Sequence, residues 1–447
     1  MSERIAVIGS GISGLSCAWL LAGRHDVTLY EADDRLGGHT NTRKVMTGQG
    51  EVAVDTGFIV YNPPAYPNLV AMLDHLGLES HDTTMTFAVS IDGGRMEYSG
   101  TDLFSLFAQK RNLFRPRHWS MIRDILRFYR EAPRHGPAAE TQSLGEFLAA
   151  GRYGAGFRDD HLLPMAAAVW SGPIDEMLEL PAAAFVRFCE NHQLMIPGER
   201  PPWRTVKGGS RRYIHQLLAE ARLHVRQACA VTRVRRTSGG VLVTDASGEE
   251  HVYDEVVIAT HADQALAMIA DPTDRERELL GAFRYSRNHA VLHDDPGFMP
   301  QRKSVWSAWN YLGVTDAAGA RQPVSVTYWM NALQSLDCTD DLFVTLNPTT
   351  PIDPARVKYA TTYEHPVFDR AALAAQREHE DIQGIDRLWF AGAHLGAGFH
   401  EDGLQAGLAV AEALGGVQRP WIVADACARV SLTPREMQPI EPEVFAA

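Results

Sequence analysis

The chain has 447 residues, of which 45% are hydrophobic and 22% charged, as is ordinary for a soluble globular protein of two or three domains. Its formal net charge of −13 argues against nucleic acid as a general partner. The five cysteines are scattered without zinc-site spacing, so we expect reduced thiols, no metal site and a cytoplasmic location. No apolar run reaches about 18 residues and a strand-like run starts close to the N-terminus, so we expect neither a membrane span nor a signal peptide.

A glycine-rich turn joins the first predicted strand, residues 5–8, to a predicted helix with an apolar face over residues 15–22. The turn reads GxGxxG, with Gly9, Gly11 and Gly14. The first glycine allows the tight turn, the second admits a pyrophosphate to the backbone, and the third lets helix and strand pack closely. Glu31 ends a second predicted strand, residues 27–30, where a carboxylate binds an adenosine ribose. The pattern predicts a dinucleotide whose phosphates lie at the helix N-terminus.

A second glycine pair favours FAD over NAD as that dinucleotide. Arg35, Gly37 and Gly38 follow Glu31 with the spacing Glu-x3-Arg-x-Gly-Gly, which lets the backbone pass a longer cofactor a second time; the alternative is an ordinary hairpin turn. Gly57 follows another strand-like run, residues 51–54, on the expected isoalloxazine side. The N-terminal residues predicted to bind FAD are Gly9, Ser10, Gly11, Ile12, Ser13, Gly14, Glu31, Ala32, Arg35, Gly37, Gly38, His39, Thr40, Gly57 and Phe58.

The remaining chain alternates between helical and strand-like regions. Helical stretches rich in aromatic residues and prolines dominate residues 63–202, and strand patterns return at 224–235, 240–245, 253–260, 324–330, 342–346 and 387–391. The order predicts an α/β protein. We expect a Rossmann-type FAD-binding domain made of residues 1–62, 203–262 and 385–447, and an inserted α+β substrate domain made of residues 63–202 and 263–384.

The last glycine-rich turn, residues 392–403, precedes a predicted helix, residues 403–414. A helix N-terminus aimed at the flavin pyrimidine would stabilise the negative charge of the reduced ring; the alternative is a turn that binds no ligand. We expect FAD contacts from Gly392, Ala393, Phe399, His400 and Gly403.

These motifs together resemble the superfamily of flavin amine oxidases and phytoene desaturases. The resemblance rests on the N-terminal run, the Gly-Gly motif at residues 206–210, residues 231–234 and residues 390–393, and it covers essentially the whole chain. It implies a Rossmann-type fold of the GR2, amine-oxidase-like kind, with the adenine held by backbone groups near Val231.

One narrower branch shares the run Gly-Phe-His-Glu-Asp-Gly at residues 398–403, together with segments 258–265, 309–311, 345–348 and 365–366. This branch comprises bacterial amine-oxidase-like flavoproteins often encoded beside cyclopropane fatty acid synthases. The resemblance implies oxidation of lipid acyl chains, including desaturation of methyl-branched chains on the way to furan fatty acids.

Three departures from amine oxidases bear on the reaction. The second tyrosine of their aromatic cage falls on Phe399, their lysine near flavin N5 has no counterpart in residues 287–291, and Cys338 lies too far upstream of the closing turn to be their covalent cysteine. We therefore expect FAD to be bound non-covalently.

Flavin oxidation also needs an acceptor for a proton. The catalytic candidates are His400, Glu401 and His365, since a neutral imidazole or a buried carboxylate suits this role. The alternatives are that Glu401 only caps the following helix and that His400 only hydrogen-bonds the flavin or the backbone.

Residues 101–135 hold eight Lys/Arg and three acidic residues, interleaved with aromatic side chains. Such a segment is able to lie on an anionic membrane, which would place the protein peripherally on the inner face of the membrane; the alternative is a solvated helical pair whose aromatics are core.

The sequence therefore predicts an FAD-dependent oxidoreductase that takes a hydride from a lipid acyl chain as a desaturase or dehydrogenase. A double-bond isomerase, a flavin amine oxidase and a non-catalytic lipid-escort protein remain the alternatives.

Overall fold

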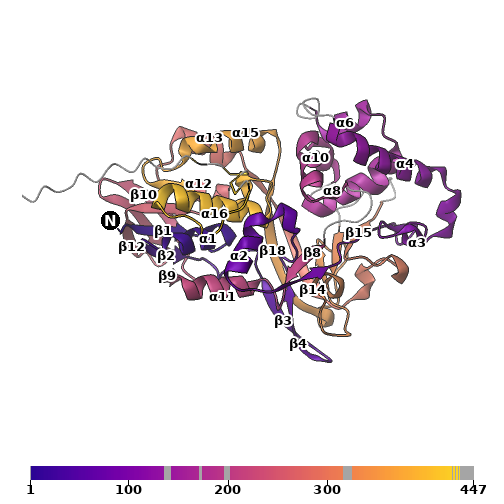
Figure 1. Ribbon diagram of the computed structural model, residues 1–447, viewed down its shortest axis with the longest axis horizontal. Helices are drawn as coiled ribbons and strands as arrows, with labels where there is room; N and C mark the ends of the chain where they lie inside the picture. Colours follow the sequence, from indigo (N-terminus) through magenta and orange to yellow (C-terminus); the bar gives the residue numbers. More distant parts are fainter. Residues whose placement is uncertain are drawn as a thin grey trace, which may run out of the picture.

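The computed structural model describes residues 2–134, 142–170, 174–195, 202–315, 325–424, 426, 427, 429, 430 and 432. Parts of the predicted segments, namely residues 1, 135–141, 171–173, 196–201, 316–324, 425, 428, 431 and 433–447, lie outside the described residues. Figure 1 shows two parts side by side, one around the strands β1 and β2 and one around the helices α4, α6, α8 and α10.

The first part is built on a five-stranded, all-parallel sheet in the order β19-β13-β1-β2-β9. Its strands come from distant stretches of the chain: β1 (Arg4–Ile8), β2 (Asp26–Tyr30), β9 (Leu223–Arg226), β13 (Glu255–Ile258) and β19 (Leu388–Phe390). Parallel strands cannot be joined by tight hairpins, so long connections link them. The second part of the molecule is formed by these connections.

Alternating residues of these strands supply two different cores. One face, including Ile5 and Val7, packs against the helices α1 (Ile12–Leu21), α2 (Pro67–His75), α11 (Arg211–Glu220) and α16 (His400–Gly415). The opposite face, including Ala6 and Ile8, packs against a three-stranded sheet and three helices. These elements are β10 (Val231–Thr237), β11 (Gly240–Asp245), β12 (Glu250–Tyr253), α12 (Ala262–Met268), α13 (Asp274–Gly281) and α15 (Arg370–Glu378). Apolar strands buried on both faces are what a parallel sheet requires.

The second part is built on a seven-stranded sheet in the order β18-β14-β17-β16-β15-β6-β7. The pair β15–β6 is parallel and the other neighbours are antiparallel. The strands are β6 (Phe87–Ile91), β7 (Met96–Ser99), β14 (Arg284–His293), β15 (Trp309–Gly313), β16 (Ser325–Trp329), β17 (Phe343–Leu346) and β18 (Val357–Val367). Its remote end is covered by the helices α4 (Pro116–Glu131), α6 (Leu144–Ala150), α8 (Leu163–Trp170), α9 (Ile174–Glu179) and α10 (Ala182–Asn191).

Two short two-stranded sheets link the parts. The hairpin β3 (Thr42–Thr47) and β4 (Gly50–Asp55) follows the second glycine turn, and β5 (Ser80–Thr83) pairs with β8 (Trp203–Val206). The short elements α3 (Leu103–Leu106), η2 (Lys110–Phe114), α7 (Ala155–Phe157) and α14 (Met330–Gln334) complete the segments used below. No helix in the part of the chain that the structure describes has the length and apolar character to cross a membrane.

Two local predictions were wrong. Residues 224–235 do not form one strand, because the chain leaves the parallel sheet after β9 and enters a different sheet at β10. Helices dominate the described residues of the region 63–202, as predicted, although this region also contributes the strands β5, β6 and β7. The final helix begins at His400 rather than Gly403, because Asp402 accepts a hydrogen bond from the Phe399 amide (2.8 Å) and so caps the helix one turn earlier.

Candidate functional site

A cavity of about 970 Å³ lies between the two parts of the molecule. At one end it is lined by the turn after β1 and by Glu31, Ala32, Arg35 and Val231. The other end, called here the aromatic end, is lined by Tyr66, Val169, Phe188, His192, Trp203, Trp309, Tyr328 and Phe399. The cavity thus runs from the carboxyl ends of the parallel strands, where ligands of open α/β sheets bind, to the second part of the molecule.

The turn between β1 and α1 has the geometry of a phosphate cradle. A Cβ atom added to Gly14 would lie 1.8 Å from the carbonyl oxygen of Gly9, which itself has φ +101°. A Cβ atom on Gly11 would meet nothing within 4 Å, although Gly11 lines the cavity. The free N–H groups of the first turn of α1 point out of the helix here and favour an anionic ligand.

The second glycine turn lies against the first. A Cβ atom on Gly38, which has φ +53°, would be 3.2 Å from the Cα atom of Gly11. The nearby Arg35 side chain is largely buried, and its Nη1 atom has no hydrogen-bond partner. A buried guanidinium donor without a partner beside a cavity is the environment that an anionic group such as a pyrophosphate would satisfy.

Glu31 ends β2 and faces the same end of the cavity. Its carboxylate accepts hydrogen bonds from the backbone N–H groups of Ser10 (3.0 Å) and Asp33 (2.8 Å), which fix its position. Val231 lines the cavity at the start of β10, where the pairing with β11 shifts register. A carboxylate for a ribose and a half-buried strand start at the cavity wall for a base fit the adenosine half of FAD.

Most residues predicted to bind FAD line this cavity. They are Gly9, Ser10, Gly11, Ile12, Ser13, Glu31, Ala32, Arg35, Gly38, His39, Gly57, Phe58, Val231, Gly392, Ala393, Phe399 and His400. Gly14, Gly37, Thr40 and Gly403 do not belong to the lining, and each supports the wall from behind. A Cβ atom on Gly403, for example, would lie 2.8 Å from Ile12 Cγ2, so this glycine lets α16 pack closely on α1.

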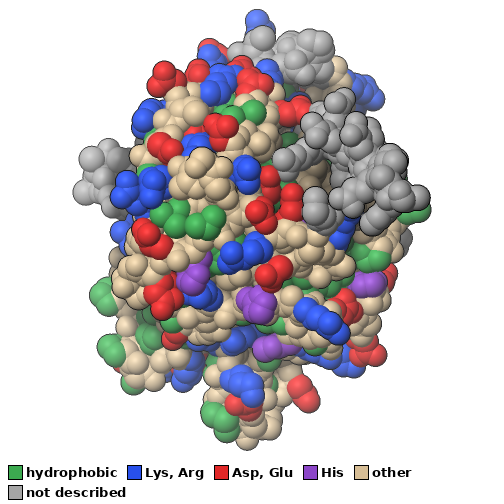
Figure 2. All heavy atoms as spheres, turned by 90° about the vertical axis from the view of Figure 1, so that its left-hand side faces the viewer, with side chains coloured by type: hydrophobic (Ala, Val, Ile, Leu, Met, Phe, Trp, Pro, Cys, Tyr) green, Lys and Arg blue, Asp and Glu red, His purple; other side chains and the backbone are tan. Residues whose placement is uncertain are grey.

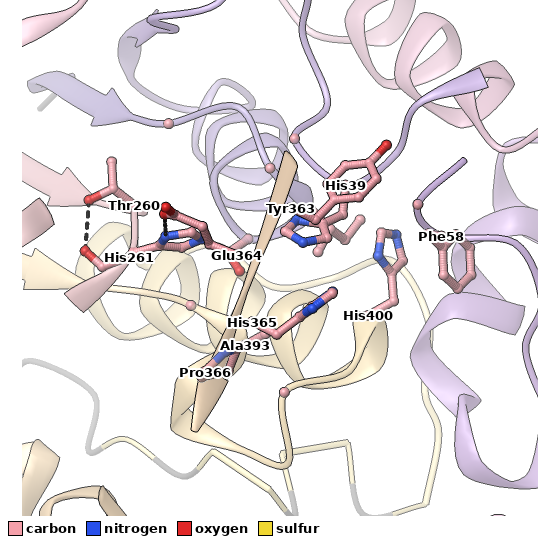
Figure 3. A pocket seen from close by; sticks show the side chains of 18 of the residues that line it. His39, Phe58, Thr260, His261, Tyr363, Glu364, His365, Pro366, Ala393 and His400 are labelled. Atoms are coloured by element: carbon pink, nitrogen blue, oxygen red, sulfur yellow. Dashed lines mark hydrogen bonds and ion pairs between the residues drawn. The ribbon is translucent and has the colours of Figure 1, made fainter. Parts of the chain in front are cut away.

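Histidines form much of the cavity wall between its two ends. Figure 3 shows Tyr363 and His365, both from β18, near His39 and His400. The His39 ring lies 4.9 Å from the Tyr363 ring and 5.2 Å from the His365 ring. Burial, followed by repulsion from His365 and other histidines, holds the pKa of His39 well below its ordinary value. This histidine wall is therefore uncharged at neutral pH.

His400 stands at the start of α16 and is held on two sides. Its ring stacks on Phe58 with centroids 3.8 Å apart, and its Nε2 atom is hydrogen-bonded to the Tyr213 hydroxyl (2.9 Å). The Tyr213 hydroxyl is in turn hydrogen-bonded to the hydroxyl of Thr40. Burial lowers the pKa of His400 to about 3. The Tyr213 and Thr40 hydroxyls thus form a short polar path behind the ring.

His365 has one tautomer fixed by its partner. Asn288 donates a hydrogen bond from Nδ2 to His365 Nδ1 (2.9 Å), while Asn288 Oδ1 accepts one from Asn347 Nδ2 (2.8 Å). Nδ1 is therefore the acceptor, and Nε2 carries the proton. Burial, and secondly repulsion from His261, lowers the pKa of His365 to about 4.

The structure does not bring Glu401 to the cavity. The carboxylate is fully buried and accepts hydrogen bonds from the backbone N–H groups of Asn68 (3.0 Å) and Leu69 (2.9 Å) and from the side chains of Asn68 and Gln405. These amides begin α2, so Glu401 caps the neighbouring helix α2. The prediction that Glu401 is catalytic is thus wrong, because its carboxylate does not line the cavity and both of its oxygens accept hydrogen bonds from the surrounding structure.

Apart from Phe399, which was expected to contact FAD, sequence reasoning did not identify the residues of the aromatic end. Phe188 and His192 come from α10, and their rings lie 4.9 and 5.1 Å from the Phe399 ring. Trp309 and Tyr328 come from β15 and β16, with rings 5.4 Å apart. Each looks like an ordinary core residue in its own segment. The signal available for Trp309 was the likeness of residues 309–311 to one narrow branch of flavoproteins.

Comparison with known proteins gives a family for this arrangement. The model of the flavin containing amine oxidoreductase family matches residues 12–292. AofH of Mycobacterium tuberculosis, assigned as a flavin-containing monoamine oxidase, is 26% identical over 335 residues, 72% of this chain and 70% of that protein. An L-amino-acid oxidase of Pseudechis australis is 54% identical over 41 residues, which are 9% of this chain and only 8% of the oxidase.

Solved structures share the fold at low identity. A CLA-producing fatty acid isomerase from P. acnes has a TM-score of 0.65 and 18% identity over 91% of this chain and 97% of that chain. Cyclohexylamine oxidase from Brevibacterium oxydans has a TM-score of 0.63 and 16% identity over 92% of this chain and 99% of that chain. The predicted α/β, amine-oxidase-like fold is thereby confirmed.

Proposed function

The chain belongs to the family of flavin-containing amine oxidoreductases and its cofactor is FAD, and from this premise we propose that it oxidises a lipid acyl chain as an FAD-dependent desaturase or dehydrogenase. When bound, FAD accepts a hydride from the substrate. The residues that would hold it are the two glycine turns, Glu31 and Arg35, with Val231 at the adenine and Phe399 and His400 near the isoalloxazine.

Non-covalent binding is part of the proposal. Cys229 is the one cysteine among the described residues that line the cavity, and it lies beside Val231, at the end opposite the aromatic end. The cysteines Cys17 and Cys189 are buried in the cores, where burial raises their pKa well above the ordinary value. A buried protonated thiol is a poor nucleophile for attachment.

We favour a lipid over an amine substrate because none of the described residues at the aromatic end has a carboxylate that could pair with an ammonium group. Among the described residues that line the cavity, the carboxylates are Glu31, Asp33 and Glu364. The first two face the ribose end, and Glu364 is paired with His261 (3.4 Å) and Arg287 (3.5 Å). An ammonium group bound at the aromatic end would lose its hydration without gaining an ion pair, which is unfavourable. An acyl chain would bury apolar surface there, which is favourable.

The chain's own residues exclude water and move a proton. The stacked rings of Phe188 and Phe399 and the neighbouring Trp309 shield the aromatic end. His400 is neutral because burial lowers its pKa, so its ring has a free lone pair able to accept a proton from the substrate. The Tyr213 hydroxyl, which stays protonated because burial raises its pKa, orients the His400 ring through its hydrogen bond to Nε2. His365, with its proton on Nε2, is suited to donate a hydrogen bond into the cavity.

A double-bond isomerase is the second candidate, favoured by the likeness of fold to the fatty acid isomerase. An isomerase would take a hydride and return it to the same chain, so both candidates need the same apolar end and the same histidines. They differ only in whether the flavin stays reduced.

The test is anaerobic mixing of the yellow protein with phospholipids that carry oleoyl or methyl-branched chains, while flavin absorbance is followed and products are analysed by mass spectrometry. Lasting bleaching with a new double bond supports the desaturase, and a moved double bond without lasting bleaching supports the isomerase. Bleaching by amines such as putrescine or cyclohexylamine but not by lipids would show an amine oxidase instead. A folded protein that takes up no FAD would leave only a lipid-escort role.

A further inference from the structure

Exposed apolar side chains gather on one surface of the helical end of the molecule. Phe104 and Phe114 are 91% and 86% exposed, and Leu113, Trp119 and Leu126 are each 45–57% exposed. Every exposed phenylalanine and tryptophan in the part of the chain that the structure describes lies within this segment. We call the surface formed by residues 104–130 of α3, η2 and α4 the basic aromatic surface.

The helix α4 places apolar and basic side chains on a single stripe. Trp119, Arg123, Leu126 and Arg130 are spaced i, i+4, i+7 and i+11, so they follow one face of the helix, and all four are exposed. The indole N–H of Trp119 donates a hydrogen bond to the carbonyl of Leu113 (2.9 Å), which fixes η2 against this face.

The aromatic residues of the segment divide between core and surface. Met121 and Phe128 on the opposite face of α4 are buried, and Phe128 packs on Phe185 of α10 with ring centroids 6.2 Å apart. The alternative that the aromatic residues of this segment fill the hydrophobic core is therefore correct for Phe128 but not for Phe104, Phe114 or Trp119. Large exposed aromatics beyond what packing needs mark an interaction surface.

The charge of this surface is mostly positive although the whole chain has a net charge of −13. Residues 101–135, which include this surface, contain eight Lys/Arg and three acidic residues, and two of these acids, Asp124 and Glu131, form ion pairs with Arg123 and Arg130. The exposed Lys110, Arg111 and Arg134 add positive charge around the apolar side chains. By contrast, the opposite end of the molecule, seen in Figure 2, has basic and acidic side chains interspersed.

We propose that the basic aromatic surface docks on a membrane that contains anionic phospholipids, with the exposed aromatic side chains in the interface and the arginines at the headgroups. Exposed aromatic and aliphatic side chains flanked by Lys/Arg have the chemistry of such an interface. A second copy of this chain fits less well, because a symmetric contact would place these arginines against their own copies.

The same helical layer carries the aromatic end of the cavity. Val169 of α8 and Phe188 of α10 line that end, and these helices share one core with α4. Docking would therefore hold the wall of the substrate end on the membrane side of the molecule. The inference does not depend on the proposed function, since binding is measured without turnover.

The experiment is sedimentation of the FAD-loaded protein with phosphatidylcholine vesicles that do or do not contain phosphatidylglycerol. We expect binding to the anionic vesicles only, and release near 1 M salt, where the Debye length is about 3 Å. The double variant Arg123→Gln/Arg130→Gln should weaken partitioning about 30-fold, from about 1 kcal/mol per basic residue. Phe104→Ser/Phe114→Ser should weaken it at least about tenfold.

Matched controls keep the test specific. Arg370→Gln/Arg377→Gln changes the net charge equally, with the same spacing of seven residues on the exposed side of α15, and should change partitioning less than about twofold. Ile422→Ser removes an equally exposed apolar side chain elsewhere and should have no effect. Equal loss in the control variants, or equal binding to neutral vesicles, would overturn the proposal. So would a dimer in solution that Phe104→Ser/Phe114→Ser converts to a monomer.

Discussion

Replacing Gly11 by alanine tests the assignment of the phosphate cradle without disturbing the fold. Gly11 has φ −61° and ψ 175°, a conformation that alanine adopts readily. Its added Cβ atom would meet no protein atom within 4 Å. The methyl group would instead project into the cavity that Gly11 lines, at the place where the pyrophosphate is expected. We therefore predict an intact protein with weakened FAD binding.

The expected size follows from the cost of forcing one methyl group into a packed contact, about 1–3 kcal/mol, or a roughly 5- to 150-fold increase in Kd. Thermal unfolding with and without FAD measures both effects. At a concentration about 100 times the wild-type Kd, FAD should stabilise the wild type by about 2.7 kcal/mol, and a variant with 50-fold weaker binding by only about 0.6 kcal/mol. Without FAD the two proteins should unfold at the same temperature.

Gly14→Ala is the contrasting variant. Its Cβ atom would lie 1.8 Å from the carbonyl oxygen of Gly9, so the FAD-free protein itself should unfold at a lower temperature or fail to accumulate. If Gly11→Ala bound FAD as tightly as the wild type by fluorescence titration, the pyrophosphate could not lie against this turn, and the reasoning would be refuted.

Three further predictions concern the histidine wall and Glu401. His400→Ala, with FAD still bound, should slow substrate-driven flavin reduction at least about tenfold in stopped-flow absorbance, and an unchanged rate would remove His400 from proton transfer. Glu401→Gln should lower stability by about 1–3 kcal/mol through lost hydrogen bonds to α2, with the reduction rate of bound FAD unchanged; a slow, fully stable variant would contradict this. Because burial lowers the pKa of His365 from 6.5 to about 4, the folded protein binds fewer protons than the unfolded chain between these values. The unfolding free energy of the FAD-free protein should therefore fall as pH drops from 6.5 toward 4, and His365→Gln should reduce that fall, as measured by urea unfolding.

The FAD end of the site could be predicted from the sequence because most of its residues lie close together in the chain and each needs a particular backbone conformation. The backbone at Gly9 and Gly38 has positive φ, and a packed Gly14 leaves no room for a side chain, so the residue types themselves record the geometry. Glu31 follows from the same unit, since β2 runs beside β1 in register and ends at the same edge.

The aromatic end could not be predicted in the same way because its residues come from distant parts of the chain. Phe188 and Trp309 lie 121 positions apart in the sequence and line one cavity only because α10 and β15 pack into the same core. Nothing in either segment distinguishes a ring that lines a cavity from a ring that fills a core. The sequence likewise does not show whether Phe104, Phe114 and Phe128 are exposed or buried. The structure shows that the first two are exposed and that Phe128 is buried.

The run of residues 398–403 shows why a shared signature is not a catalytic motif in itself. Successive residues of a helix point about 100° apart, so the first turn of α16 sends consecutive side chains in different directions. His400 lines the cavity, Glu401 caps α2, and Asp402 binds the Phe399 amide and Arg429 (3.0 Å). Two of these three polar residues thus hold α16 in place between α1 and α2, which is what positions the third. A change at Glu401 or Asp402 would reach the flavin only by moving His400, and this is why stability and reduction rate must be measured on the same variant.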